Sequence, residues 1–219
     1  MSINDVRSQV YNLLNSSKTR GITTEQPFTD DYRDIAAMLY DSGTTSINIG
    51  QSREWAIDVY SKLMEMDNNP FSHNNIFVKR KGEKVIGSII AYDPTRMDYK
   101  KSLAEIKKVI GEKSPNYFHE FKKTYSRWFK YSQPKKHGGN CEIIFGIGAV
   151  GGITKFSIAS ILKDFRSTSS WKSKEFVYVD VDYNDSSVID GYKDAGFTNI
   201  RAIDGSYNKC IVVRMYKKC

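Results

Sequence analysis

The chain of 219 residues has a size typical of one globular domain, since single hydrophobic cores rarely grow beyond ~250 residues. Hydrophobic residues make up 40% and charged residues 26% of the sequence, which excludes wholesale disorder. Its apolar stretches are much shorter than the ~20 residues of a membrane-spanning helix. Residues 1–14 also lack the uninterrupted apolar core of a secretion signal, so we expect a cytoplasmic protein.

The net charge of +8 is unevenly distributed along the chain. It is −4 for residues 1–70, +10 for residues 71–140 and +2 for residues 141–219. A basic middle segment can attract nucleic acid or an anionic cofactor, and it can also be a solvated helical face. The three cysteines, Cys141, Cys210 and Cys219, show no metal-ligand spacing, so reduced thiols and no metal site are expected.

The first third of the chain predicts an N-terminal helical extension followed by a strand and two helices. Residues 1–20 contain an amphipathic helix that either covers a sheet face or forms a homodimer contact. A strand is expected over 23–28, and a helix follows with Ile35, Ala36, Leu39 and Tyr40 on one face. A second helix is expected over 52–66.

The middle of the chain predicts a β-hairpin and then a helical insertion. Strands are expected over 76–79 and 85–92, because both runs are rich in β-formers and a glycine-containing loop separates them. Residues 94–140 carry many lysines at helical spacing, with helices expected over 102–110 and 117–131. This basic helical insertion interrupts the sheet strands.

The last third predicts a β-α-β unit and a closing strand pair. Strands are expected over 142–148 and 176–182 with a helix over 154–165 between them, and a right-handed crossover makes these two strands parallel. A helix over 186–195 ends at Gly196, a left-handed cap. Strands over 200–203 and 210–216 follow. In the strand over 176–182, Asp180 and Asp182 share one face, toward either a substrate groove or solvent. The fold class is α+β.

A glycine-rich turn, Gly146-Ile147-Gly148-Ala149-Val150-Gly151, matches the G-x-G-x-x-G pattern between a strand and a helix. That pattern is typical of the phosphate turn of an NAD-dependent oxidoreductase. However, Asp180 lies 29 residues beyond Gly151, where ~20 is usual for a ribose-binding acid. Only one further parallel strand is expected after the turn, so this interpretation ranks below the one that follows.

Three stretches resemble the GCN5-related N-acetyltransferases, the GNAT superfamily. Residues 23–43 read TTEQPFTDDYRDIAAMLYDSG and resemble that family's first strand and helix. Residues 75–93, NIFVKRKGEKVIGSIIAYD, look like its second and third strands. Residues 177–197, VYVDVDYNDSSVIDGYKDAGF, are similar to its fifth strand and following helix. The resemblance covers about residues 21–216, so we expect residues 1–219 to form a single GNAT-like domain.

The resemblance implies a mixed, mostly antiparallel sheet whose parallel fourth and fifth strands splay apart to hold acetyl-CoA. It assigns the cofactor to the chain around the fourth strand and the following helix, and to the residue after the fifth strand: Ile147, Gly148, Ala149, Val150, Gly151, Gly152, Thr154, Lys155 and Asn184. The family's pyrophosphate loop reads Gln/Arg-x-x-Gly-x-Gly/Ala, whereas the glycines here come early and the Gln or Arg is missing. Cofactor binding is therefore either retained through backbone N–H groups or weakened.

The resemblance also implies direct attack of an amine on the thioester of acetyl-CoA. Tyr192 matches the tyrosine that protonates the departing thiolate, and its alternative role is packing on the helix face. Glu142 is the candidate general base, and its alternative role is a salt bridge at the rim. The expected partner is a small-molecule or peptide amine. A non-catalytic GNAT-like domain that binds nucleic acid or a protein is the alternative function.

Overall fold

The computed structural model describes residues 22–43, 52–132, 140–166, 169–203 and 212–219. The strands, in chain order, are β1 (Ile22–Glu25), β2 (Ile76–Lys81), β3 (Lys84–Tyr92), β4 (Cys141–Ala149), β5 (Phe176–Asp182), β6 (Thr198–Ile203) and β7 (Val212–Lys218). The α-helices are α2 (Tyr32–Ser42), α3 (Arg53–Met64), α4 (Tyr99–Ile106), α5 (Pro115–Ser132), α6 (Lys155–Phe165), α7 (Ser169–Lys172) and α8 (Ser186–Asp194). The predicted helix over residues 1–20 lies outside these ranges.

The described strands form one seven-stranded sheet in the order β1-β2-β3-β4-β5-β7-β6. Neighbouring strands run antiparallel except β4 and β5, which are parallel. The expected α+β class and the parallel step near the end of the chain are therefore confirmed. Two antiparallel half-sheets meet at this parallel pair, and α6 and α7 supply the crossover between its strands.

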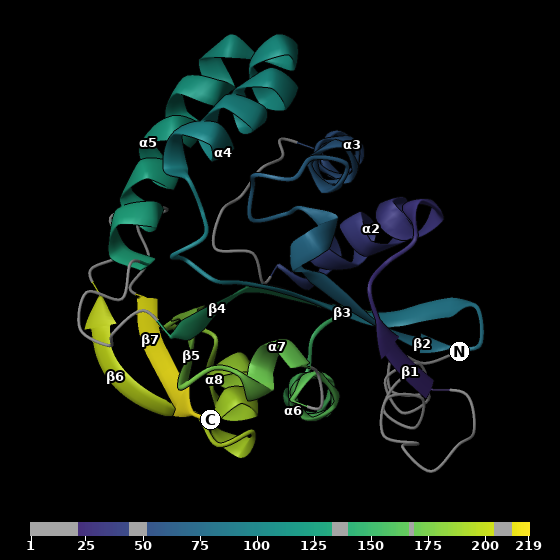
Figure 1. Ribbon diagram of the computed structural model, residues 1–219, viewed down its shortest axis with the longest axis vertical. Coiled ribbons are helices and arrows are strands. Elements are labelled where there is room, and N and C mark those ends of the chain that lie inside the picture. The colour runs from purple at the N-terminus through teal and green to yellow at the C-terminus, as the bar shows by residue number, and fades with distance from the viewer. Residues whose placement is uncertain (1–21, 44–51, 133–139, 167–168, 204–211) are drawn as a thin grey trace.

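Helices cover both faces of the sheet (Figure 1). On one face, α2 and α3 bury Ile35, Leu39 and Leu63 against β-strand residues that include Phe145. On the other face, α6, α7 and α8 form a second core around Ile158, whose side chain is fully buried. Successive strand residues point to opposite faces, so the inner strands β2, β3, β4, β5 and β7 contribute to both cores.

The basic insertion forms a helical hairpin that stands away from the sheet on the side of α3 (Figure 1). Asp98 caps α4 by accepting N–H hydrogen bonds from Lys100 and Lys101, and a π-helical segment over Lys107–Gly111 continues it. Buried Phe121 and Tyr125 of α5 stack at 5.7 Å between ring centroids. These residues extend the core that α2 and α3 form with the sheet, while Lys100, Lys107 and Lys122 of the hairpin are exposed.

The first helical turn of α6 packs closely against α8. A Cβ atom added to Gly191 would lie 2.8 Å from the Cα of Lys155 and 3.0 Å from Cδ1 of Ile158. Real side chains essentially never approach a backbone atom that closely. Glycine at this position therefore sets the separation of the two helices and, through Lys155, the position of the segment that links β4 to α6.

We predict that Gly191→Ala destabilises the protein by about 1–3 kcal/mol, because the added methyl group meets backbone rather than a side chain that can move aside. Urea unfolding followed by circular dichroism measures the change. Ser187→Ala, at an exposed position of the same helix, is the control and should change stability by no more than about 0.5 kcal/mol. A Gly191→Ala variant as stable as the wild type would contradict the close contact.

Candidate functional site

The parallel strands β4 and β5 are paired along only part of their length. The ladder runs from Cys141 opposite Phe176 to Ile144 opposite Val179. Beyond these residues, β4 continues to Ala149 and β5 to Asp182 without pairing to each other. The two strands therefore form a fork whose closed end lies at their amino ends and whose open end lies at their carboxyl ends.

The open arm of β4 presents backbone groups toward β5. Ala149 donates its N–H to Oγ of Ser42 at 3.4 Å, and so it does not bond to β3. Hydrogen-bonding direction alternates along an antiparallel strand, so Ile147, two residues earlier, directs its N–H and C=O toward the same side. An extended ligand lying in the fork would meet peptide groups here, as an added strand meets a sheet edge.

The segment after β4 turns sharply before α6 begins. The N–H groups of Val150 and Gly152 donate to the carbonyls of Ile86 and Ala149 at 3.2 and 3.1 Å. Gly151 and Gly152 have φ angles of 80° and 91°, in the left-handed region that glycine adopts without strain. No atom lies within 4 Å of where a Cβ of Gly152 would be, so the turn has open space beside it.

The first turn of α6 is fixed by a capping box. Thr154 accepts the N–H of Ser157 on Oγ1 at 3.2 Å, and Thr154 donates its own N–H to Oγ of Ser157 at 2.7 Å. The N–H groups of Lys155 and Phe156 lie between these two, where the helix itself provides no acceptor carbonyl. The hydroxyl of Thr154 caps the helix by accepting the N–H of Ser157. An anion bound at this turn would therefore contact backbone groups and the side chain of Lys155.

The interpretation of the glycine-rich stretch as a dinucleotide turn is wrong. Gly146 and Gly148 lie inside β4, and the turn does not start until after Ala149. A Cβ at Gly148 would lie 2.8 Å from Oγ of Ser88 and 3.1 Å from Cβ of Met38, so glycine is needed there for packing against α2. The sheet is also mostly antiparallel, whereas a dinucleotide-binding fold needs successive parallel strands.

Tyr192 lies on α8, directly after the glycine that contacts α6. Its side chain is 3% exposed, and its ring meets that of Phe197 edge-on at 5.3 Å between centroids. Burial raises the pKa of Tyr192 well above the usual value for a tyrosine. The phenol is therefore protonated at neutral pH, which is the state that a general acid requires.

Glu142 lies at the closed end of the fork, opposite Val177 in the ladder. Its side chain is 2% exposed and lines a polar cavity of about 420 Å³. Asp93 and Lys174, which form an ion pair at 2.7 Å, line the same cavity. Burial by itself would raise the pKa of Asp93, but hydrogen bonds from Lys174 and Thr95 outweigh it and hold that pKa below its usual value.

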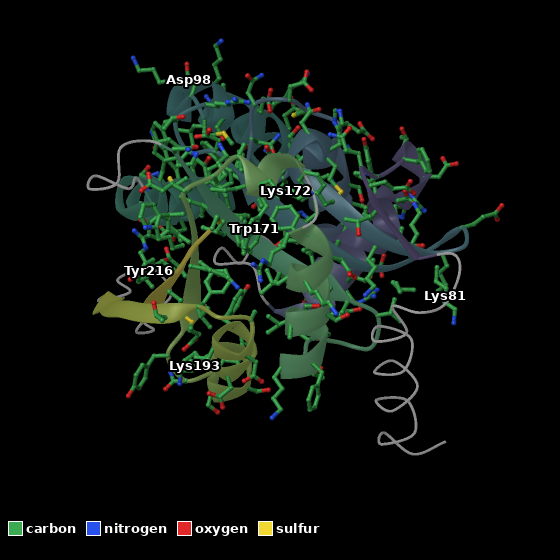
Figure 2. All side chains as sticks on the ribbon, turned by 60° about the horizontal axis from the view of Figure 1, so that its bottom comes forward. Lys81, Asp98, Trp171, Lys172, Lys193 and Tyr216 are labelled. Atoms are coloured by element: carbon green, nitrogen blue, oxygen red, sulfur yellow. The ribbon has the colours of Figure 1, made fainter. Side chains whose placement is uncertain are left out.

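The predicted site residues thus occupy three places: Tyr192 is buried in the core between α6 and α8, and the others lie at the two ends of the fork. Those of the open arm of β4 and the start of α6 are contiguous, and Asn184 lies at the same carboxyl end, in the turn after β5. Its side chain is exposed, and its N–H donates to Oδ1 of Asp182 at 2.9 Å. Glu142 belongs instead to the amino ends of the strands. Figure 2 shows the face of the sheet that α6, α7 and α8 cover.

The sequence analysis singled out only one member of an ion pair that lies beside the fork. Asp180 faces Arg214 of β7, and two hydrogen bonds of 2.7 Å each join the carboxylate to the guanidinium. The two side chains are 7% and 10% exposed, so Asp180 is not solvated. The alternation of side chains along the strand predicted that Asp180 and Asp182 share one face. It gave no indication of Arg214, because β7, which carries Arg214, is remote from β5 in the chain.

Neither a metal centre nor a membrane segment is formed by the described part of the chain. Within it, no three His, Cys, Asp or Glu side chains are grouped so as to hold a metal ion. None of its helices combines the length and hydrophobicity needed to cross a bilayer. Cys141 is buried, and burial raises the pKa of its thiol to about 11, so the thiol is not activated at neutral pH.

Comparison with known proteins identifies the fold. No protein-family model and no curated protein matches the sequence. Among solved structures, spermidine N-acetyltransferase from Vibrio cholerae in complex with CoA and spermine is similar over 91% of this chain and 96% of its own, with 13% identity and a TM-score of 0.53. Agmatine N-acetyltransferase is similar over 91% and 100%, with 9% identity and a TM-score of 0.56. A GNAT-family acetyltransferase from Bacillus anthracis covers 91% and 95%, with 8% identity and a TM-score of 0.52. The chain has the GNAT fold, as its sequence led us to expect.

We predict that the stability of the protein falls as the pH rises above about 10, in part because of Tyr192. Its pKa is raised in the folded state, so above pH 10 the unfolded chain loses a proton that the folded chain keeps. Tyr192→Phe should flatten the fall by up to about 1.4 kcal/mol per pH unit, measured by urea unfolding at several pH values. Below pH 9 the two proteins should show the same slope. Equal slopes above pH 10 would contradict the buried phenol.

Proposed function

We propose that this chain is an N-acetyltransferase that moves an acetyl group from acetyl-CoA to a small-molecule amine. The observation that carries the proposal is the fork between β4 and β5, in which the backbone edge around Ile147 and Ala149 faces away from β3. Strands that diverge within a sheet leave a place where an extended ligand can lie along a strand edge, as an added strand does. The structural neighbours, which bear the names of N-acetyltransferases, add support from the fold.

The residues at the open end of the fork would bind successive parts of the CoA molecule. Ile147, Gly148, Ala149 and Val150 would lie along the pantetheine. Gly151, Gly152, Thr154 and Lys155 would surround the pyrophosphate. The N–H groups of Gly152 and Thr154 are bonded within the turn, so the start of α6 and the Lys155 side chain would supply the positive end of the helix dipole and the charge. Asn184 offers a side-chain amide from the opposite arm. Backbone donors and Lys155 would take the place of the Gln or Arg that the loop lacks.

Acetyl-CoA supplies the acetyl group already activated as a thioester. The amine nitrogen bonds to the carbonyl carbon, the bond from that carbon to sulfur breaks, and the thiolate takes a proton. Tyr192 is our candidate donor of that proton, because a tyrosine phenol is protonated at neutral pH and can donate its proton. The amine must lose a proton, and Glu142 is our candidate to receive it. Glu142 lies at the closed end of the fork, so water in the adjoining cavity would have to relay the proton.

The acceptor is proposed to be a small amine, with a peptide amine as the alternative. The helices α4 and α5 carry exposed lysines, among them Lys100, Lys107 and Lys122. Positive charge on this insertion disfavours a polycationic acceptor beside it and suits an amine that also bears a carboxylate or phosphate. The same lysines favour the second candidate function, a non-catalytic domain that binds nucleic acid. The affinity of such a domain for nucleic acid would fall steeply as the salt concentration rises.

We predict that acetyl-CoA raises the thermal unfolding midpoint of the protein. At 100 times its dissociation constant, a ligand stabilises the folded state by about 2.7 kcal/mol, which for a chain of this size is roughly 5–10 °C. Differential scanning fluorimetry with acetyl-CoA, CoA and NAD makes the comparison. A shift with NAD alone would contradict the fold assignment, and no shift with any of the three would favour the non-catalytic alternative.

We predict that Tyr192→Phe lowers kcat by about 10²–10⁴-fold if Tyr192 is the general acid, with little change in acetyl-CoA affinity. The hydroxyl is lost but the buried ring stays, so the packing against Phe197 is kept. Release of the free thiol with a panel of amines gives kcat, and isothermal titration calorimetry gives the affinity. Tyr183→Phe, which removes an exposed hydroxyl, is the matched control. An unchanged kcat for Tyr192→Phe would leave Tyr192 a packing residue.

A further inference from the structure

The helical hairpin formed by the basic insertion carries a groove of its own, which we call the hairpin groove. It lies between the end of α4 with its π-helical continuation and the start of α5, and its volume is about 520 Å³. Ligand pockets usually measure ~300–1,000 Å³, so the groove has room for an apolar side chain of a partner. Its surface is mostly apolar, and its lining includes Ala104, Lys107, Lys108, Gly111, Pro115 and Phe118.

Glycine at position 111 keeps the floor of the hairpin groove open. A Cβ atom added there would lie 3.3 Å from Cγ of Lys107 and 3.7 Å from Cγ of Phe118, so the lysine stem and the phenyl ring flank the glycine. Gly111 ends the π-helical segment, a rare geometry that is often found at functional sites. The buried residues Ile110 and Phe121 of the hairpin belong to the core instead. The groove therefore lies on a part of the hairpin that solvent reaches.

Lysines without a carboxylate partner surround the hairpin groove. Two other lysines of the hairpin, Lys113 and Lys123, have carboxylate partners at 3.6 and 2.8 Å. Within the described ranges, no ion pair involves the exposed lysines that line the groove or lie one helical turn from it, which are Lys100, Lys101, Lys107, Lys108 and Lys122. Helical residues three or four positions apart share a face, so these lysines lie on the side of Ala104 and Phe118. Their charge is available to an anionic partner.

The chain itself has no acidic segment that would complement these lysines from outside the described ranges. Residues 1–21 have a net charge of +2, from three basic and one acidic side chain. Residues 133–139 contain two lysines and no acid, and residues 204–211 contain one of each sign. Residues 44–51 and 167–168 are uncharged. Charge complementarity therefore points to a partner from another molecule.

We propose that the hairpin groove docks an acidic segment of another protein through an apolar anchor side chain. The anchor contacts Ala104 and Phe118, and carboxylates on either side of it pair with the surrounding lysines. Single-stranded nucleic acid is bound instead by aromatic rings on which bases stack. The exposed large hydrophobic residues of the described chain, Phe28, Phe156 and Tyr183, all lie outside the hairpin. An apolar floor between lysines thus fits a protein segment better, and this inference does not depend on the function proposed above.

The test measures binding of the full chain to a fluorescein-labelled helical peptide, with leucines on one face and glutamates elsewhere, by fluorescence anisotropy. Replacing the leucines with alanine, or the glutamates with lysine, should weaken binding at least about tenfold. The double variant Lys107→Glu and Lys108→Glu should weaken it about tenfold, and more at low than at high salt. Ala104→Phe, whose ring fills the groove without changing the charge, should also weaken it about tenfold.

The matched control is the double variant Lys81→Glu and Lys84→Glu. It makes the same change in net charge at exposed positions of the turn between β2 and β3, and it should change peptide affinity by no more than about twofold. Thermal unfolding of each variant confirms that it is folded. The thermal shift with acetyl-CoA should be the same in the groove variants and the wild type, so failure of this inference leaves the proposed function untouched.

Each outcome decides the inference. Loss of peptide binding in both groove variants, with the control intact, supports it. Unchanged binding in Ala104→Phe overturns it, because charge alone then attracts the peptide, and so does a wild-type protein that does not bind the peptide. An oligonucleotide, single-stranded or duplex, that binds more tightly than the peptide and loses affinity in the lysine variant overturns it in favour of nucleic acid. A dimer seen by light scattering that Ala104→Phe dissociates overturns it in favour of a second copy of the chain.

Discussion

The short parallel ladder between β4 and β5 is the constraint on which the rest of the molecule depends. It joins two antiparallel half-sheets through the pairing from Cys141 with Phe176 to Ile144 with Val179. Parallel strands need a crossover connection, and here α6 and α7 supply it on one face of the sheet. Because the pairing stops after Val179, the strands diverge. The same connection that builds the ladder therefore places the start of α6 at the mouth of the fork.

Buried charges hold the elements around that fork. Lys79 of β2 is 3% exposed on its side chain and lies 2.6 Å from the carboxylate of Asp164 on α6, with Ser160 at 2.9 Å. This contact ties α6 to the antiparallel half-sheet, while Asp180 and Arg214 tie β5 to β7. Removing one member of such a pair leaves an uncompensated charge, which is far more destabilising than the pair is stabilising. Each half-sheet is thus held by a buried ion pair, one to α6 and one between its own strands.

The helical insertion extends the fold without altering the sheet. It leaves the end of β3 and returns at the start of β4, so both of its ends lie at the closed end of the fork. Its aromatic residues extend the core that α2 and α3 form with the sheet, and Trp55 of α3 meets Tyr117 edge-on at 5.2 Å. Asn68 and Asn69, which follow α3, donate hydrogen bonds to the carboxylate of Glu105. The basic surface is consequently fixed relative to α3, so its charge acts from a defined position.

The sequence by itself determined most of the described elements, their order and the α+β class, because alternation and helical spacing are local properties of the chain. The strand over 176–182 and the cap at Gly196 were placed to the residue. Four-residue α7 was missed, since so short a helix has no periodicity. Only the tertiary structure decided the chemistry: that Gly148 packs on α2 instead of holding a phosphate, that Asp180 meets Arg214, and that Glu142 lies at the closed end of the fork. These outcomes depend on which strands become neighbours, and residues remote in the chain leave no mark on each other's local pattern.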